Sequence, residues 1–73
     1  MSNPTPEQLA IFLNNRGYKI VETDTSYFAY TDNRYSPPFL KEDDEIGGKY
    51  LIKILSVFGI SIEEFKQDWN DET

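Results

Sequence analysis

The sequence predicts an α+β domain in two layers, with the element order helix, three antiparallel strands, helix and short helix. Two segments, one before residue 17 and one between residues 47 and 59, repeat apolar residues with the period of a helix that buries one face. Between them the chain changes to near alternation of apolar and polar residues, which is typical of half-buried strands. Both longer helices can then lie on one face of the sheet and leave the other face to solvent or a partner.

The first helix is predicted to begin after Thr5. Thr5 fits the N-cap, Pro6 suits the first helical position, and Gln8 completes a Thr-x-x-Gln capping box. The buried face of this helix is expected to consist of Leu9, Phe12 and Leu13. Gly17 supplies the stop, because glycine adopts the left-handed conformation of a helix end at little cost.

Three strands are expected to follow, near residues 18–23, 27–31 and 34–39. The first two mix β-branched and aromatic residues, which favour strands. Residues 24–26 are interpreted as a turn. Asp32 and Asn33 tolerate positive φ, so a tight hairpin is predicted between the second and third strands.

Alternation assigns the side chains of the middle strand to two faces. Phe28 and Tyr30 share one face, and Tyr27 and Ala29 share the other. The third strand contains the dipeptide at residues 37–38, which is Pro-Pro. Since proline cannot donate a hydrogen bond to a ladder, this strand is predicted to lie at an edge or to end early.

The C-terminal half is the most clearly specified segment. Its apolar stripe at i, i+3, i+4 and i+7 consists of Leu51, Ile54, Leu55 and Phe58. Gly59 then ends the helix, and Ser61 and Glu64 form a Ser-x-x-Glu capping box for the next one. Ile60 and Phe65 occupy the positions of a hydrophobic staple. A long helix, a glycine stop and a short second helix are therefore predicted.

A chain of 73 residues has room for one small core, so residues 1–73 are assigned to one domain. Its ends, residues 1–4 and 70–73, are expected to fray. The predicted core consists of Leu9, Phe12, Leu13, Ile20, Leu51, Ile54, Leu55 and Phe58.

The composition excludes several classes of chemistry. Thirteen acidic residues against seven basic ones give a net charge of −6, which argues against binding nucleic acid by neutralising phosphates. The chain has no histidine, the commonest general acid–base group at neutral pH, and no cysteine for a disulfide or a thiolate metal site.

No cofactor, metal or membrane segment is predicted. The acidic run at residues 42–45 offers carboxylate ligands, but it lacks the alternation and the internal glycine of a calcium loop. No apolar run approaches the roughly 20 residues of a membrane span, and no signal-peptide core follows the polar start. A cytoplasmic location is therefore expected.

Two segments carry a family resemblance. Residues 15–18, Asn-Arg-Gly-Tyr, lie where the HicA family (also called YcfA-like) often has Asn-Gly-Trp or Asp-Gly-Tyr. Residues 46–61 are similar to the family pattern of leucine, small residues, Leu-x-x-Ile-Leu-x-x-x-Gly and Ile-Ser. About residues 6–65 resemble this family of small mRNA-cleaving toxins from bacterial toxin–antitoxin pairs. The resemblance implies a fold like a double-stranded-RNA-binding domain, α-β-β-β-α, here with a short extra C-terminal helix.

The catalytic residue of that family does not carry over. The family's second strand begins with Gly-Ser-His, and its histidine is implicated in RNA cleavage. Here the matching residues are Thr25, Ser26 and Tyr27. A phenol titrates near pH 10, whereas imidazole titrates near 6.5, so Tyr27 cannot exchange protons at pH 7 with comparable efficiency. No catalytic residue is predicted, and the chain resembles a HicA scaffold without its nuclease activity.

The leading hypothesis is a non-catalytic HicA-like protein-interaction module, derived from a toxin–antitoxin pair and acting as a regulator or inhibitor. Its candidate partner surface consists of Tyr27, Tyr30, Tyr35, Pro37, Pro38 and Phe39. The helices can cover only one sheet face, so some of these rings should be exposed, and exposed tyrosines are typical of interfaces. A HicB-like antitoxin or another host protein is the expected partner.

Two alternatives stay open. The chain could be an RNA-binding or mRNA-cleaving toxin that acts without histidine, which a basic patch would favour, although the net charge disfavours RNA. The residues of such a patch would be Lys19, Arg34, Lys41, Lys49 and Lys53. It could instead be an inhibitor of a defence protein that imitates nucleic acid with its acidic loop, residues 42–45.

Overall fold

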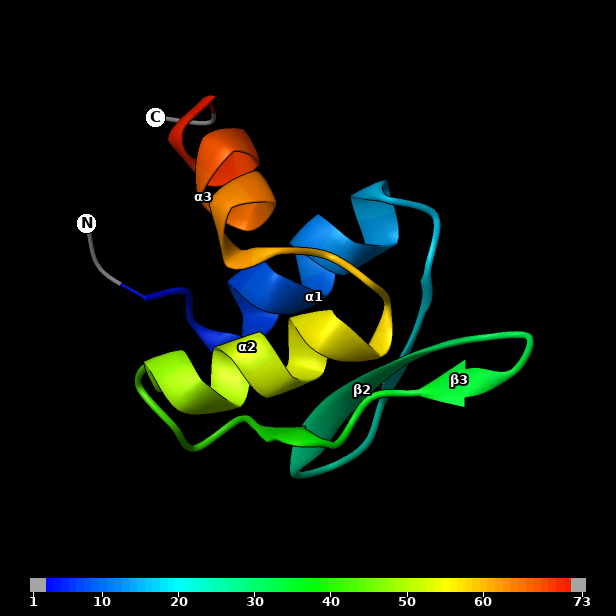
Figure 1. Ribbon diagram of the computed structural model, residues 1–73. Helices are drawn as coiled ribbons and strands as arrows, with labels where there is room; N and C mark the ends of the chain where they lie inside the picture. Colours follow the sequence, from blue (N-terminus) through cyan, green and yellow to red (C-terminus); the bar gives the residue numbers. More distant parts are fainter. Residues whose placement is uncertain (1–2, 72–73) are drawn as a thin grey trace.

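The computed structural model describes the backbone of residues 3–71 and the side chains of residues 3–68. It confirms the predicted α+β fold: a helix, an antiparallel sheet, and two further helices (Figure 1). The elements are α1 (Pro6–Asn15), β1 (Lys19–Glu22), β2 (Ser26–Thr31), β3 (Arg34–Tyr35), β4 (Phe39–Leu40), α2 (Gly48–Val57) and α3 (Ile62–Asp71). In Figure 1, α1 and α2 lie on the same side of the strands.

The start of α1 confirms the predicted capping box. The Thr5 hydroxyl accepts a hydrogen bond from the Gln8 amide (3.1 Å), and the Gln8 side chain accepts one from the Thr5 amide (2.9 Å). At the other end, Gly17 has a φ of 97°, in the left-handed region that glycine adopts without strain. Local chemistry therefore sets both ends of this helix.

The segment before α1 is tied to the rest of the chain. Pro4 is fully buried, and its carbonyl oxygen accepts a hydrogen bond from the Ile46 amide (2.8 Å). The expected fraying of residues 1–4 thus does not extend to Pro4. Residues 70 and 71 belong to α3, whereas residues 1–2 and 72–73 lie outside the described part of the chain.

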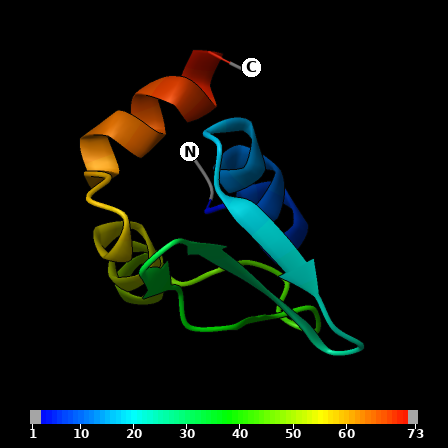
Figure 2. The ribbon, with the colours of Figure 1, turned by 90° about the vertical axis from the view of Figure 1, so that its right-hand side faces the viewer.

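β2 is the central strand of the sheet. It pairs antiparallel with β1 along one edge and with both β3 and β4 along the other. The predicted third strand is thus broken into two short pieces with Pro37 and Pro38 between them, as expected from residues that cannot donate to a ladder. Figure 2 shows β1 beside α1 and the long central strand behind it.

The break adds one residue to the outer strand. Tyr30 lies opposite Tyr35, and Tyr27 lies opposite Phe39. Two residues separate the tyrosines on β2, but three residues, 36–38, separate Tyr35 from Phe39. Such an extra residue is a β-bulge, and it moves the following side chains to the opposite face of the sheet. Phe39 therefore points toward the helices although Tyr35 does not.

Ser36 forms two hydrogen bonds with Ala29 of β2 at the bulge, where the regular ladder is interrupted. Its amide donates to the Ala29 carbonyl oxygen (2.8 Å), and its hydroxyl oxygen accepts from the Ala29 amide (3.0 Å). Ser36 and Ala29 are both buried, so an unpaired amide here would be costly. A serine hydroxyl thus takes the place of a ladder carbonyl.

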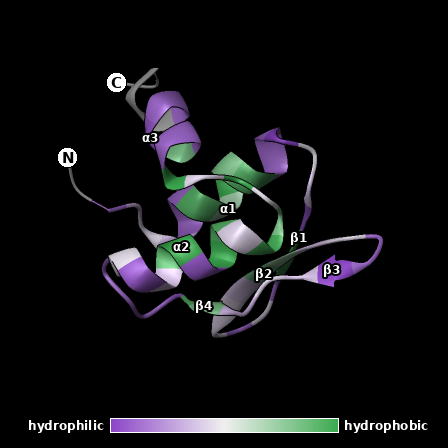
Figure 3. Ribbon diagram, viewed as in Figure 1, coloured by the Kyte–Doolittle hydropathy of each residue, from purple (hydrophilic) through white to green (hydrophobic). Residues whose placement is uncertain are grey.

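The core lies between the helices and one face of the sheet. All the predicted core residues are buried except Ile20, which is partly buried and packs against the others. The buried core also contains Ala10, Ala29, Phe39, Ile46, Ile60 and Phe65. In Figure 3 the apolar segments of α1 and α2 lie next to one another, whereas α3 is largely hydrophilic.

α2 and α3 are separated by the predicted glycine stop, with Gly59 at a φ of 72°. α3 then attaches to α1 through Phe65, whose ring packs edge-on against Phe12 with centroids 4.7 Å apart. The Ser61 half of the predicted capping box forms, since its hydroxyl accepts from the Glu64 amide (3.0 Å). The Glu64 carboxylate pairs with Arg16 of the α1 C-cap and joins the two helices.

Candidate interaction surface

The structure divides the predicted partner surface between the two faces of the sheet. Tyr30 and Tyr35 share the face that the helices leave open, whereas Tyr27 and Phe39 share the helix-covered face. Phe39 is only 1% exposed and belongs to the core. Its place on a partner surface is therefore wrong, and the physical reason is the bulge, which reverses the face that simple alternation predicts.

The sheet face away from the helices carries an aromatic pair near the hairpin between β2 and β3. The rings of Tyr30 and Tyr35 are stacked, with centroids 5.8 Å apart and an angle of 18° between their planes. Tyr35 is 67% exposed and Tyr30 is half-buried. Cross-strand pairing assigns further residues to this surface, which we call the open sheet face: Lys19, Val21, Phe28, Tyr30, Tyr35 and Leu40. These side chains are mostly apolar or aromatic, with Lys19 directly opposite Tyr30, and the same register puts the buried Ser26 on this face opposite Leu40.

The two prolines lie at the edge of the sheet beside the bulge. Pro37 is half-buried, and its carbonyl oxygen accepts from the Ser36 hydroxyl (3.0 Å). Pro38 is exposed, and its carbonyl oxygen accepts from the Tyr50 hydroxyl of α2. Both prolines thus hold the bulge in place, and only Pro38 offers a large exposed surface.

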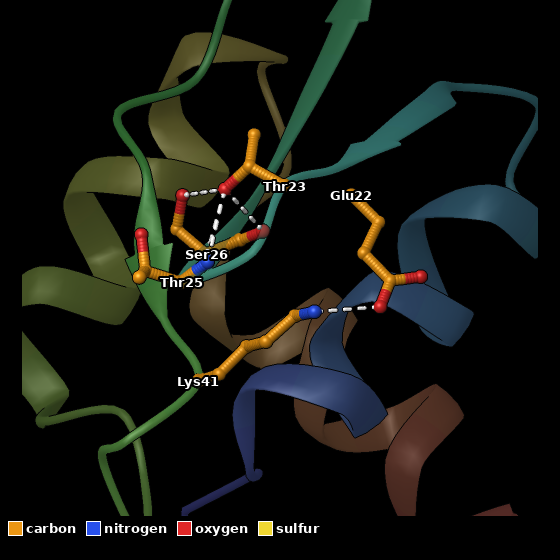
Figure 4. Close-up of polar contacts among 5 residues, drawn as sticks. All are labelled: Glu22, Thr23, Thr25, Ser26 and Lys41. Carbon is orange, nitrogen blue, oxygen red and sulfur yellow. Dashed lines mark hydrogen bonds and ion pairs between the residues drawn. The ribbon is translucent and has the colours of Figure 1, made fainter.

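Tyr27 lies on the helix-covered face and has charged neighbours. Its ring stacks on Phe39 with centroids 6.1 Å apart, and the Lys41 ammonium lies 5.2 Å from the centre of the ring. Lys41 also donates to the Glu22 carboxylate (2.6 Å), as Figure 4 shows. This hydrogen bond raises the pKa of Lys41, against the smaller opposing effect of desolvation. Two residues from the β4 region, Phe39 and Lys41, thus lie next to this ring.

The turn before β2 holds its hydroxyl groups in a local network (Figure 4). The Thr23 hydroxyl accepts from the Ser26 amide (3.0 Å) and from the Thr25 amide (3.3 Å). The Ser26 hydroxyl lies 3.0 Å from that of Thr23, and Ser26 is buried. The serine that this chain shares with the family motif therefore stabilises a turn. A nucleophilic serine would need an adjacent base, and its neighbour here is another hydroxyl.

A hollow of about 290 Å³ opens between α1 and the first two strands. Its walls consist of Glu7, Ala10, Ile11, Asn14, Ile20, Glu22 and Tyr27. The lining combines the apolar side chains of Ala10, Ile11 and Ile20 with the carboxylates of Glu7 and Glu22. Among the described residues, no group of three or more acidic side chains is placed to hold a metal ion. This hollow was not predicted from the sequence, although the spacing of its α1 residues is that of a second helical stripe.

The five basic residues named above are spread over several parts of the fold. Lys19 is on β1, Lys49 and Lys53 are on α2, and two others are engaged within the molecule. Lys41 pairs with Glu22, and Arg34 donates to the Val57 carbonyl oxygen (3.1 Å). Residues 42–45 follow β4 and are exposed, so the acidic loop is accessible.

None of the helices in the described part of the chain combines the length and the apolar character that a membrane span requires. Comparison of the chain with protein-family models, with curated proteins and with solved structures found no match. The fold and the side-chain geometry above are therefore the basis for a function.

Proposed function

We propose that this chain is a non-catalytic protein-interaction module on a HicA-like scaffold, a regulator or inhibitor derived from a toxin–antitoxin pair. It binds its partner through the open sheet face. The observation that supports this proposal most strongly is the stacked pair Tyr30–Tyr35 on the sheet face that the described helices leave open, with Tyr35 67% exposed. Tyrosines are enriched at protein interfaces because they bury a large area at a small entropic cost.

The surroundings of Tyr27 support the absence of catalysis. Its position corresponds to the histidine of the resembled family, and the chain contains no histidine that could replace it. The ring packs against Phe39 and Lys41, and the neighbouring Ser26 hydroxyl is used in the turn. The Tyr27 ring and the Ser26 hydroxyl can therefore stabilise the sheet and its turn without exchanging a proton.

The charge of the chain supports a protein partner over RNA. The net charge is −6, and two of the five candidate basic residues are occupied by contacts within the molecule. An RNA-binding surface needs clustered, accessible lysines and arginines. A HicB-like antitoxin or another host protein is the partner class that the resemblance implies.

A binding titration tests the interaction surface. The partner is isolated from the native host, identified by mass spectrometry and purified, and its affinity is measured for the wild type and for Tyr35→Ala. We expect the variant to lose about 1–2 kcal/mol, which is roughly 5- to 30-fold in Kd, at unchanged stability. Ile52→Ala is the matched control, because Ile52 is 51% exposed but lies on α2.

If Tyr35→Ala and Tyr30→Ala both bind the partner like the wild type, the open sheet face is not the site. The acidic loop, residues 42–45, is then the next surface to test.

An RNA cleavage assay tests the absence of catalysis. We expect the purified chain to leave a defined mRNA intact at pH 7, with or without magnesium. Turnover that disappears in Tyr27→Phe would contradict the proposal and support a toxin that acts without histidine.

A further inference from the structure

β1 has a free edge. Among the described residues, β1 pairs only with β2. The Thr23 amide donates to the Ser26 carbonyl oxygen (2.8 Å), which fixes the alternation of the antiparallel ladder. Lys19 and Val21 therefore direct their amide and carbonyl groups toward β2, and Ile20 and Glu22 direct theirs away from it. Two residues of β1 thus present backbone donors and acceptors along an open edge.

The hollow described above lies beside this edge. One of its walls is a stripe of α1, at i, i+3, i+4 and i+7: Glu7, Ala10, Ile11 and Asn14. The other wall includes the side chains of Ile20 and Glu22, the same residues whose backbone groups point outward. A segment that pairs with this edge would therefore direct every second side chain into the hollow.

The lining of the hollow is partly apolar and partly acidic. Ala10 and Ile20 are apolar, and Ile11 is 54% exposed, so an aliphatic side chain would cover surface that water now contacts. Glu7 forms no ion pair with a described residue, and Glu22 shares its charge with Lys41. The formal charges of Glu7, Glu22 and Lys41 sum to −1. The hollow is therefore complementary to an aliphatic residue next to a cationic one.

The edge is also protected against indiscriminate pairing. β1 has only four residues, with a charged residue at each end, Lys19 and Glu22. Short, charged edges resist aggregation through their backbone alone. Binding here would consequently depend on side chains that fit the hollow.

We propose that the edge of β1 and the α1–β1 hollow form a docking groove for an extended segment of a partner protein, which adds to the sheet as a further strand. The segment places an aliphatic side chain over Ala10, Ile11 and Ile20, and a lysine or arginine two residues away toward Glu7. Strand addition of this kind takes its affinity from main-chain hydrogen bonds and its specificity from alternate side chains. This groove is separate from the open sheet face.

A display library of random ten-residue peptides, selected on the full chain, tests the groove. We expect enriched peptides with an aliphatic residue two positions from a lysine or arginine. Their Kd, measured by fluorescence anisotropy, should rise about tenfold in Ile11→Ala and in Glu7→Lys, and should stay unchanged in the controls Ile52→Ala and Tyr35→Ala. A selection without enrichment, or peptides that are insensitive to both groove variants, would overturn the proposal.

Amide hydrogen exchange tests the strand addition itself. On binding an enriched peptide, the amides of Ile20 and Glu22 should exchange at least tenfold more slowly, whereas those of Lys19 and Val21 already face β2 and should change less. Glu22→Ala removes only the carboxylate and should weaken binding, whereas Glu22→Pro also removes one outward amide and should weaken it at least tenfold further. Equal protection of all four amides, or equal affinity of the two Glu22 variants, would show that the peptide does not pair with β1.

Discussion

β2 carries two stacked aromatic pairs that are similar in geometry and different in environment. The ring centroids of Tyr27 and Phe39 lie 6.1 Å apart, and those of Tyr30 and Tyr35 lie 5.8 Å apart. Each pair lies across two antiparallel strands. Phe39 is 1% exposed, whereas Tyr35 is 67% exposed. The first pair faces the helices and joins the core, and the second faces outward.

The difference teaches that strand register, and not residue type, assigns these rings to the core or to the surface. Tyr35 and Phe39 are four residues apart, so regular alternation would put both on the same face. The extra residue at the Ser36–Pro38 break places them on opposite faces. A search for interface aromatics from sequence would consequently group residues that the sheet separates.

The largest expected difference between the two pairs is in stability. Phe39→Ala should lower the free energy of unfolding by about 3–5 kcal/mol, because it leaves a cavity in a small core. Tyr35→Ala should lower it by less than about 1 kcal/mol, since its ring is mostly in water already. Urea denaturation of both variants measures this comparison, and equal losses would show that the two pairs have been assigned to the wrong faces.

The bulge that separates the pairs can be tested next. Ser36→Ala removes the acceptor for the buried Ala29 amide and should cost about 1–2 kcal/mol in urea denaturation. Ser56→Ala is the control, since its hydroxyl bonds to the Lys53 carbonyl oxygen on an exposed helix face. Ser56→Ala should change the free energy of unfolding by no more than about 0.5 kcal/mol. A neutral Ser36→Ala would mean that the bulge does not depend on this hydroxyl.

The smallest expected effect concerns the ion pair between Lys41 and Glu22, which lies beside Tyr27. The hydrogen bond to Glu22 raises the pKa of Lys41 above 10.5 in the folded state. The stabilisation from this cation is therefore complete below pH 10.5 and is lost as the pH rises through the raised pKa. Lys41→Met should lower the Tm slightly at pH 8, and the difference from the wild type should shrink as the pH rises through the raised pKa of Lys41.

Melting curves of both proteins across this range provide the measurement. A difference that grows with pH would contradict the expected sign of the effect. A matched change, Lys66→Met, should show no such dependence, because Lys66 forms no ion pair with a described residue.

Much of the helical part of the fold could be predicted because its signals are local. The capping box of Thr5 and Gln8 and the stop at Gly59 are decided within a few residues. The stripe that includes Leu51 and Leu55 depends only on the helical period. The edge position and early end of the third strand were likewise predictable, because a proline has no amide to donate wherever the strand lies, but its continuation as β4 was not predicted.

The candidate site was less predictable because its members meet only in three dimensions. Tyr30 and Tyr35 were rightly expected on a sheet surface, but Phe39 was not recognised as core, since the extra residue of a bulge has no marker beyond the prolines. The contact of Pro4 with Ile46 joins residues far apart in the sequence. The hollow forms only when α1 packs beside β1, because its lining comes from both elements.

The sequence by itself determined the types of the elements, their order and the ends of the helices, because hydrogen bonds and periodicities within a few residues decide these features. The tertiary structure decided which face of the sheet each aromatic ring occupies and which backbone edge stays free. Those features depend on strand register and helix packing. A single added residue in the outer strand changes the face on which Phe39 lies. The position of α1 beside β1 creates the groove along the free edge of that strand.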